Sequence, residues 1–136
     1  MTLQQRLVIA VALGSGLGAA TRFGLSLVFY LPPGTGFPVA TLVANVAGSL
    51  LMGLLAVLTD PDGRWPTHPE FRQFLLGGFC GGFTTFSLLS LESLLLVGQG
   101  AWSTALLYVG LTLLLCLPAV ALGYRCGTIL QTQKSR

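Results

Sequence analysis

The stretch GGFCGGFTTFS, Gly77 to Ser87, lies inside one of the most apolar parts of the chain. Glycine occupies four of its first six positions, and two threonines follow between two phenylalanines. Each glycine in a helix interior costs about 1 kcal/mol relative to alanine. We therefore expect the helix that carries this stretch to be broken at mid-membrane, in a place where protein or a cavity surrounds the freed backbone groups.

The composition indicates a membrane protein. Of the 136 residues, 53% are hydrophobic and 8% are charged, whereas soluble proteins carry about 25% charged residues. The basic residues are scattered and form no basic face with aromatic partners, so we expect no nucleic-acid partner. The three cysteines and the single histidine stand far apart, a pattern that predicts neither a disulfide framework nor a metal cluster.

Four apolar runs are long enough to cross a bilayer, which takes about 20 residues. The predicted spans are residues 6–31, 39–59, 73–97 and 101–124, separated by the turn-rich segments PPGTGFP, DPDGRWPTHPEFR and GQG. The first run is too long for a signal-peptide core of roughly 7 to 15 residues. Short connections predict antiparallel neighbours, so residues 1–136 should form a single all-α, four-helix membrane domain with a frayed QTQKSR tail.

The charges predict an orientation. With four spans, both termini and the second connection share one side of the membrane, and the cations on that side are Arg6, Arg64, Arg72, Arg125, Lys134 and Arg136. The first and third connections contain no lysine or arginine, so the positive-inside rule places the termini in the cytoplasm. Arg22 lies deep in the first span, and we expect its side chain to snorkel to the opposite interface.

Polar side chains recur on two of the spans at helical spacing. Thr41, Asn45 and Ser49 form one stripe, and Thr104, Tyr108, Thr112 and Cys116 form another. A single hydroxyl can bond back to its own helix, but two aligned stripes favour a polar pathway or an inter-helix seam. Glu92 is the one acid within a span, which makes it a functional candidate by default; the alternative is a side chain that reaches the nearby interface.

The break itself offers two kinds of ligand. Freed carbonyls bind cations, and the positive edges of Phe83 and Phe86 favour an anion without a fixed charge. The competing interpretation is that Phe79, Phe83 and Phe86 fill core space. For Gly14, Gly18, Gly48 and Gly53 we favour a packing role, because small residues let helix backbones approach closely in lipid.

These residues resemble the Fluc (CrcB-like) fluoride channels, small four-span proteins of the prokaryotic cell membrane. The resemblance covers essentially the whole chain. It rests on GSGLGAATRF in the first span, TLVANVAGSLLMG in the second, GFCGGFTTFS with SLES in the third, and Tyr108 with Thr112 in the fourth.

The resemblance implies an antiparallel dimer with two pores that passively export fluoride. It also implies a structural sodium ion, not transported, on the backbone carbonyls of Gly81 and Thr84. Arg22 matches an arginine that supports the vestibule. The implied pore residues are Asn45, Thr85, Phe86, Ser87, Ser90, Glu92, Tyr108, Thr112 and Cys116.

The chain departs from the family pattern at two pore positions and in its charge. Leu89 stands where members usually have a second pore phenylalanine, and Cys116 stands where serine is common. The charge bias leaves two partners open, a second copy of the chain or a separate, oppositely oriented homologue. A small proton-coupled efflux transporter is the alternative function, although it needs a central carboxylate. A membrane scaffold and an enzyme explain fewer of the polar residues.

Overall fold

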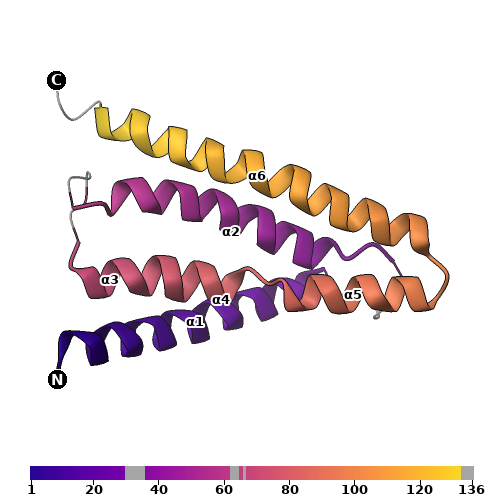
Figure 1. The fold of residues 1–136 in the computed structure, drawn as a ribbon, viewed down its shortest axis with the longest axis horizontal. Helices are drawn as coiled ribbons and strands as arrows, with labels where there is room; N and C mark the ends of the chain where they lie inside the picture. Colours follow the sequence, from indigo (N-terminus) through magenta and orange to yellow (C-terminus); the bar gives the residue numbers. More distant parts are fainter. Residues whose placement is uncertain (30–35, 62–64, 66, 133–136) are drawn as a thin grey trace.

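The computed structural model describes residues 1–29, 36–61, 65 and 67–132, and the regular secondary structure of these residues is all helical, with no strand (Figure 1). Four helical rods are long and apolar enough to cross a membrane. The first two are α1 (Leu3–Val28) and α2 (Val39–Leu58), and the last is α6 (Trp102–Thr132). The third comprises α3 (Pro69–Gln73), the π-helical segment η1 (Phe74–Cys80), α4 (Gly81–Phe83) and α5 (Ser87–Gly98). The predicted all-α, four-span fold with a broken third span is confirmed.

The ends of the rods differ from the predicted bounds. The third rod begins at Pro69, so the last turn of the predicted DPDGRWPTHPEFR connection is helical; a proline suits the first turn because its missing N–H has no helical partner there. The fourth rod continues to Thr132, which makes the start of the expected frayed tail helical. The predicted end of the first span, at residues 30–31, lies outside the described residues.

Both described termini lie at the same end of the bundle, together with the connection between α2 and α3 (Figure 1). This is the arrangement that four antiparallel spans require. A capping box starts α1: the Thr2 hydroxyl accepts a hydrogen bond from the Gln5 amide, and the Gln5 side chain accepts one from the Thr2 amide.

Gly78 and Gly82 of the opening stretch pack the third rod against α1, and the break is not at either of them. A Cβ built on Gly14 would collide with the carbonyl of Phe74, and one on Gly78 would lie 2.9 Å from the Gly14 Cα. Likewise, a Cβ on Gly82 would collide with the Ser15 carbonyl. The prediction that these glycines interrupt the helix was wrong about their role, because they sit in helical turns and permit close backbone approach.

A second glycine seam joins α2 to α6, which lie side by side along the bundle (Figure 1). A Cβ on Gly53 would collide with the Val120 carbonyl, and one on Gly123 would collide with the Leu50 carbonyl. Further along, Gly127 packs against Val57, beyond the predicted end of the fourth span. The packing role expected for Gly14, Gly18 and Gly53 agrees with these contacts, and α6 extends because α2 still supports it.

Candidate functional site

The third rod is interrupted at Thr84–Phe86, between α4 and α5, and we refer to these residues as the break. Thr84 adopts an extended conformation with φ −78° and ψ 158°. Asn45 of α2 holds the segment from the side: its Nδ2 donates to the Thr85 carbonyl at 3.0 Å, and its Oδ1 accepts from the Thr85 amide at 2.7 Å. Asn45 is only 6% exposed, so its amide replaces helical hydrogen bonds that the break has lost.

The side chains at the break divert two amides from the carbonyls that a continuous helix would pair with them. In an α-helix the carbonyl of one residue accepts from the amide four residues later. The Thr85 amide binds Asn45 in place of Gly81, and the Leu88 amide donates to the Thr85 hydroxyl at 3.2 Å in place of Thr84. The carbonyls of Gly81 and Thr84 therefore lose their helical donors and suit a cation as ligands.

Other carbonyls near the break are bonded by side chains of α1. The Ser15 hydroxyl donates to the Gly78 carbonyl, and Arg22 Nε donates to the Gly82 carbonyl, each at 3.5 Å. The Arg22 side chain reaches the backbone of the third rod, and the expectation that it snorkels to the opposite interface stays a prediction. Arg22 consequently places a positive charge beside the break.

Glu92 lies inside the bundle and accepts hydrogen bonds from two other helices. The Thr41 hydroxyl donates to Oε1 at 3.0 Å, and the Tyr108 hydroxyl donates to Oε2 at 2.6 Å. Tyr108 is fully buried and Thr41 is 4% exposed. We call Thr41, Glu92 and Tyr108 the carboxylate site. It corrects the alternative that Glu92 merely reaches the interface, and it joins the two predicted polar stripes through one acid.

The remaining predicted polar residues divide between the break and local helix bonds. The hydroxyls of Thr85 and Ser87 lie 3.1 Å apart at the start of α5. Ser90 bonds back to the Phe86 carbonyl, and Thr112 bonds back to the Tyr108 carbonyl. Cys116 is partly buried on the same helix as Thr112.

The aromatic candidates do not share one environment. Phe79 and Phe83 stack on each other with centroids 5.9 Å apart, which agrees with the core-filling interpretation for these two rings. Phe86 is 77% exposed and projects from the break at the surface of the chain. Leu89 is 5% exposed and packs in a cluster with Leu96, Ala105 and Tyr108. The structure thus separates Leu89, which faces α6, from Phe86, which faces outward.

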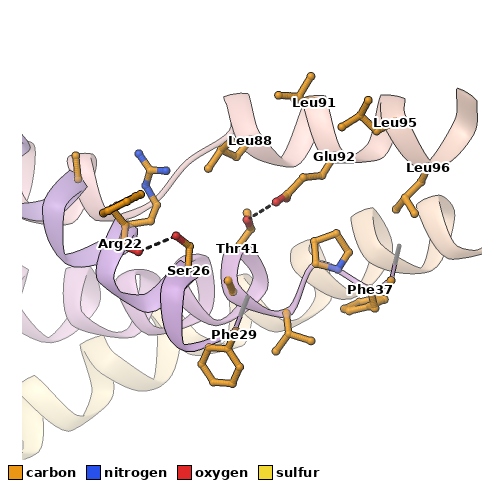
Figure 2. Close-up of a pocket in the computed structure, with 16 residues that line it drawn as sticks. Arg22, Ser26, Phe29, Phe37, Thr41, Leu88, Leu91, Glu92, Leu95 and Leu96 are labelled. Atoms are coloured by element: carbon orange, nitrogen blue, oxygen red, sulfur yellow. Dashed lines mark hydrogen bonds between the residues drawn. The ribbon is translucent and has the colours of Figure 1, made fainter. Parts of the chain in front are cut away.

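A cavity of about 440 Å³ connects Arg22 with two members of the carboxylate site. Its walls come from the second half of α1, the start of α2 and one face of α5, and Figure 2 shows Thr41 and Glu92 meeting there. The polar side chains that line it are Arg22, Ser26, Thr41 and Glu92. These four polar side chains therefore share one cavity within the chain.

Two residues of this region were not among the predicted site residues. The sequence predicted Thr41 only as a member of a polar stripe. Phe37, whose ring pairs with that of Tyr108, stands in a turn-rich connection, and no sequence pattern there indicates a role. Their roles depend on contacts with α5 and α6, which lie far away along the chain.

The fold and site define a small multi-pass membrane protein whose polar groups converge on a broken span. The chain belongs to the family described as CrcB-like protein, Camphor Resistance (CrcB), whose model matches residues 9–124. With four apolar helices and this bacterial family, it is a protein of the prokaryotic plasma membrane.

Relatives from several bacteria align over most of their own length. A protein of Paramagnetospirillum magneticum is 49% identical over 120 residues, which cover 88% of this chain and 94% of the relative. One of Opitutus terrae is 43% identical over 128 residues, covering 94% and 97%. One of Rhodospirillum rubrum is 45% identical over 116 residues, covering 84% and 88%. Each of these relatives is named as a fluoride-specific ion channel, FluC.

Proposed function

We propose that this chain is a subunit of a fluoride-selective channel that exports cytoplasmic fluoride passively and so reduces its toxicity. The observation that carries the proposal is the break of the third span, which a buried asparagine holds open beside the carboxylate site. Its family membership and the names of its relatives support the same function. The function is transport and not catalysis.

The chemistry of the break suits a small anion. Fluoride is strongly hydrated, so a selective pathway must replace its water with hydrogen-bond donors and yet bind weakly enough for the ion to leave. The second N–H of the Asn45 amide and the hydroxyls of Thr85 and Ser87 are such donors, and the edge of the Phe86 ring adds a weak positive field. The one basic side chain in the cavity, Arg22, donates to the Gly82 carbonyl, which disperses its charge.

The exposure of Phe86 supports assembly with a second, antiparallel subunit. A ring 77% exposed beside free backbone groups at the middle of a span needs protein around it, because lipid satisfies no backbone hydrogen bond. An antiparallel partner brings its own break to the same depth, and each subunit then contributes to two pores, as the family resemblance implies.

A structural sodium ion fits the carbonyls of Gly81 and Thr84. Both have lost their helical donors to Asn45 and Thr85, and both lie near the exposed side of the break. Oxygen ligands suit a hard cation, and the ion when bound supplies a positive charge between facing carbonyl dipoles. The chain's own contribution is to leave those two carbonyls without their helical donors.

The second subunit is a further copy of this chain or a paired homologue, and orientation distinguishes the two. Within the described residues, Arg6 lies at the start of α1, Arg72 in α3 and Arg125 in the last part of α6, and these parts of the helices are nearest the end of the bundle that carries the termini (Figure 1). A reporter fused after the last residue measures the orientation in cells. A single cytoplasmic orientation selects a paired homologue of opposite orientation, and a mixture of both selects the homodimer.

Glu92 keeps the proton-coupled transporter as the second candidate, because this carboxylate lies inside the bundle and lines the cavity. The two functions separate in liposomes. A channel releases fluoride down its own gradient without moving protons, whereas a proton-coupled exchanger moves a proton in the opposite direction for the fluoride that leaves. Fluoride efflux with no accompanying change of pH inside the liposomes therefore supports the channel, and proton movement in proportion to the efflux contradicts it.

A further inference from the structure

Phe37 touches the carboxylate site without belonging to it. Its ring lies 5.5 Å from the Tyr108 ring, centroid to centroid, with an angle of 80° between the ring planes. Such edge-to-face pairs attract beyond the area that they bury. Phe37 also packs against the buried cluster of Leu89, Leu96, Ala105 and Tyr108. The side chain therefore fixes one side of a tyrosine that is fully buried.

The orientation of Tyr108 decides how Glu92 is held. The phenol donates to Oε2 at 2.6 Å, while Thr41 donates to Oε1 at 3.0 Å, so each carboxylate oxygen has a donor from a different helix. Both donors lie on the side of the carboxylate that faces α2 and α6. The carboxylate is thereby held against the wall of the cavity, which Phe37 also lines (Figure 2).

We propose that Phe37 is a positioning residue for conduction, which holds Tyr108 so that its hydroxyl keeps the Glu92 carboxylate against the cavity wall. The inference rests on the proposed function, because its consequence is for the passage of an anion. A carboxylate with two donors has its charge dispersed, and one that turns into the cavity repels an anion there. Loss of the Phe37 ring lets the phenol swing away from Glu92, and the anion then meets a less neutralised charge.

The first test replaces the ring in the full-length protein in liposomes. Phe37→Leu lowers the rate of fluoride efflux about two- to tenfold, the range that an edge-to-face pair provides. Phe37→Tyr keeps the aromatic contact and retains most of the rate. Phe71→Leu is the matched control, because Phe71 lies in α3 and neither lines this cavity nor packs against the Tyr108 cluster; its rate stays at the wild-type value.

A double substitution separates positioning from general loss of packing. If Phe37 acts through the Tyr108 hydroxyl, then Phe37→Leu has no further effect once Tyr108→Phe has removed that hydroxyl. If Phe37 has only a structural role, the two substitutions act independently. The efflux rate of the double variant then falls by the product of the two factors measured for the single variants. Multiplicative rates overturn the inference, and a double variant no slower than Tyr108→Phe supports it.

A second readout does not use transport. The chain has three tyrosines, and labelling with 3-fluorotyrosine gives fluorine NMR signals, of which Tyr108→Phe identifies the one from Tyr108. Phe37→Leu shifts this signal, and Phe71→Leu leaves it in place. An unshifted Tyr108 signal overturns the inference while fluoride efflux continues. A wild-type protein that carries no fluoride overturns the proposed function itself, so the two failures are distinguishable.

Discussion

Removal of the Asn45 amide should collapse the break and abolish fluoride efflux. The amide makes two hydrogen bonds with the Thr85 backbone, at 2.7 and 3.0 Å, in a position only 6% exposed. Asn45→Ala leaves the Thr85 amide and carbonyl without these partners, at about 1–2 kcal/mol for each lost bond. The break is in equilibrium between a form that Asn45 holds in place and a form that has collapsed. A total near 3 kcal/mol lowers the ratio of the first form to the second about a hundredfold.

The assay is fluoride efflux from liposomes, measured with a fluoride electrode, on protein that remains a folded, monodisperse assembly. We expect Asn45→Ala to lower the rate by up to about a hundredfold, following the population in which the break keeps its wild-type conformation. Asn45→Asp keeps an acceptor for the Thr85 amide but sets a carboxylate oxygen against the Thr85 carbonyl, so we also expect it to abolish efflux. Ser49→Ala, one turn along the same helix, serves as the control. Wild-type flux in Asn45→Ala refutes the reasoning, because the break would then not need its clamp.

Three further predictions concern sodium, Leu89 and the glycine seam. Purification with a large organic cation in place of sodium should lower the temperature at which the proposed dimer dissociates, because the Gly81 and Thr84 carbonyls would lose the proposed sodium ion. A dissociation temperature that does not depend on the cation contradicts the sodium site. Leu89→Phe should lower the thermal midpoint of unfolding and change the rate of fluoride efflux. The substitution adds a ring to a buried cluster that includes Tyr108, at a cost of about 1–3 kcal/mol. An unchanged midpoint and an unchanged rate contradict this packing. Gly14→Ala should destabilise the protein in thermal unfolding, because the added Cβ meets the Phe74 carbonyl. Gly16→Ala has open space around it and should stabilise the protein by up to about 1 kcal/mol. Equal effects of the two substitutions would show that α1 and the third rod are not tightly packed at Gly14.

The location of the break could be predicted from the sequence, but its cause could not. The run of glycines and hydroxyls marked the right segment, and glycine's cost in a helix gave a sufficient local reason. In the structure, Gly78 and Gly82 pack against α1, and the interruption follows from hydrogen bonds between Thr85 and Asn45. A pairing between residues 40 positions apart leaves no local pattern, so only the tertiary structure reveals it.

For the two polar stripes, the sequence likewise predicted which residues share a helix face, but not which side chains of other helices they contact. Helical spacing placed Thr41 with Asn45, and Tyr108 with Thr112, because residues four apart share a face. Which face meets Glu92 depends on the rotation of each rod about its axis. The π-helical segment before the break also changes that rotation for everything that follows it. Hydropathy marked the apolar part of α6 and not its end, since α6 continues where Gly127 packs on Val57.

The central claim is that the held break and its donors conduct fluoride selectively. The measurement that tests it most directly is the efflux of fluoride and of chloride from liposomes that contain the purified protein, with the same gradient of each ion and no gradient of pH. The account predicts rapid release of fluoride while chloride stays inside. Equal release of both ions, or retention of both, contradicts it.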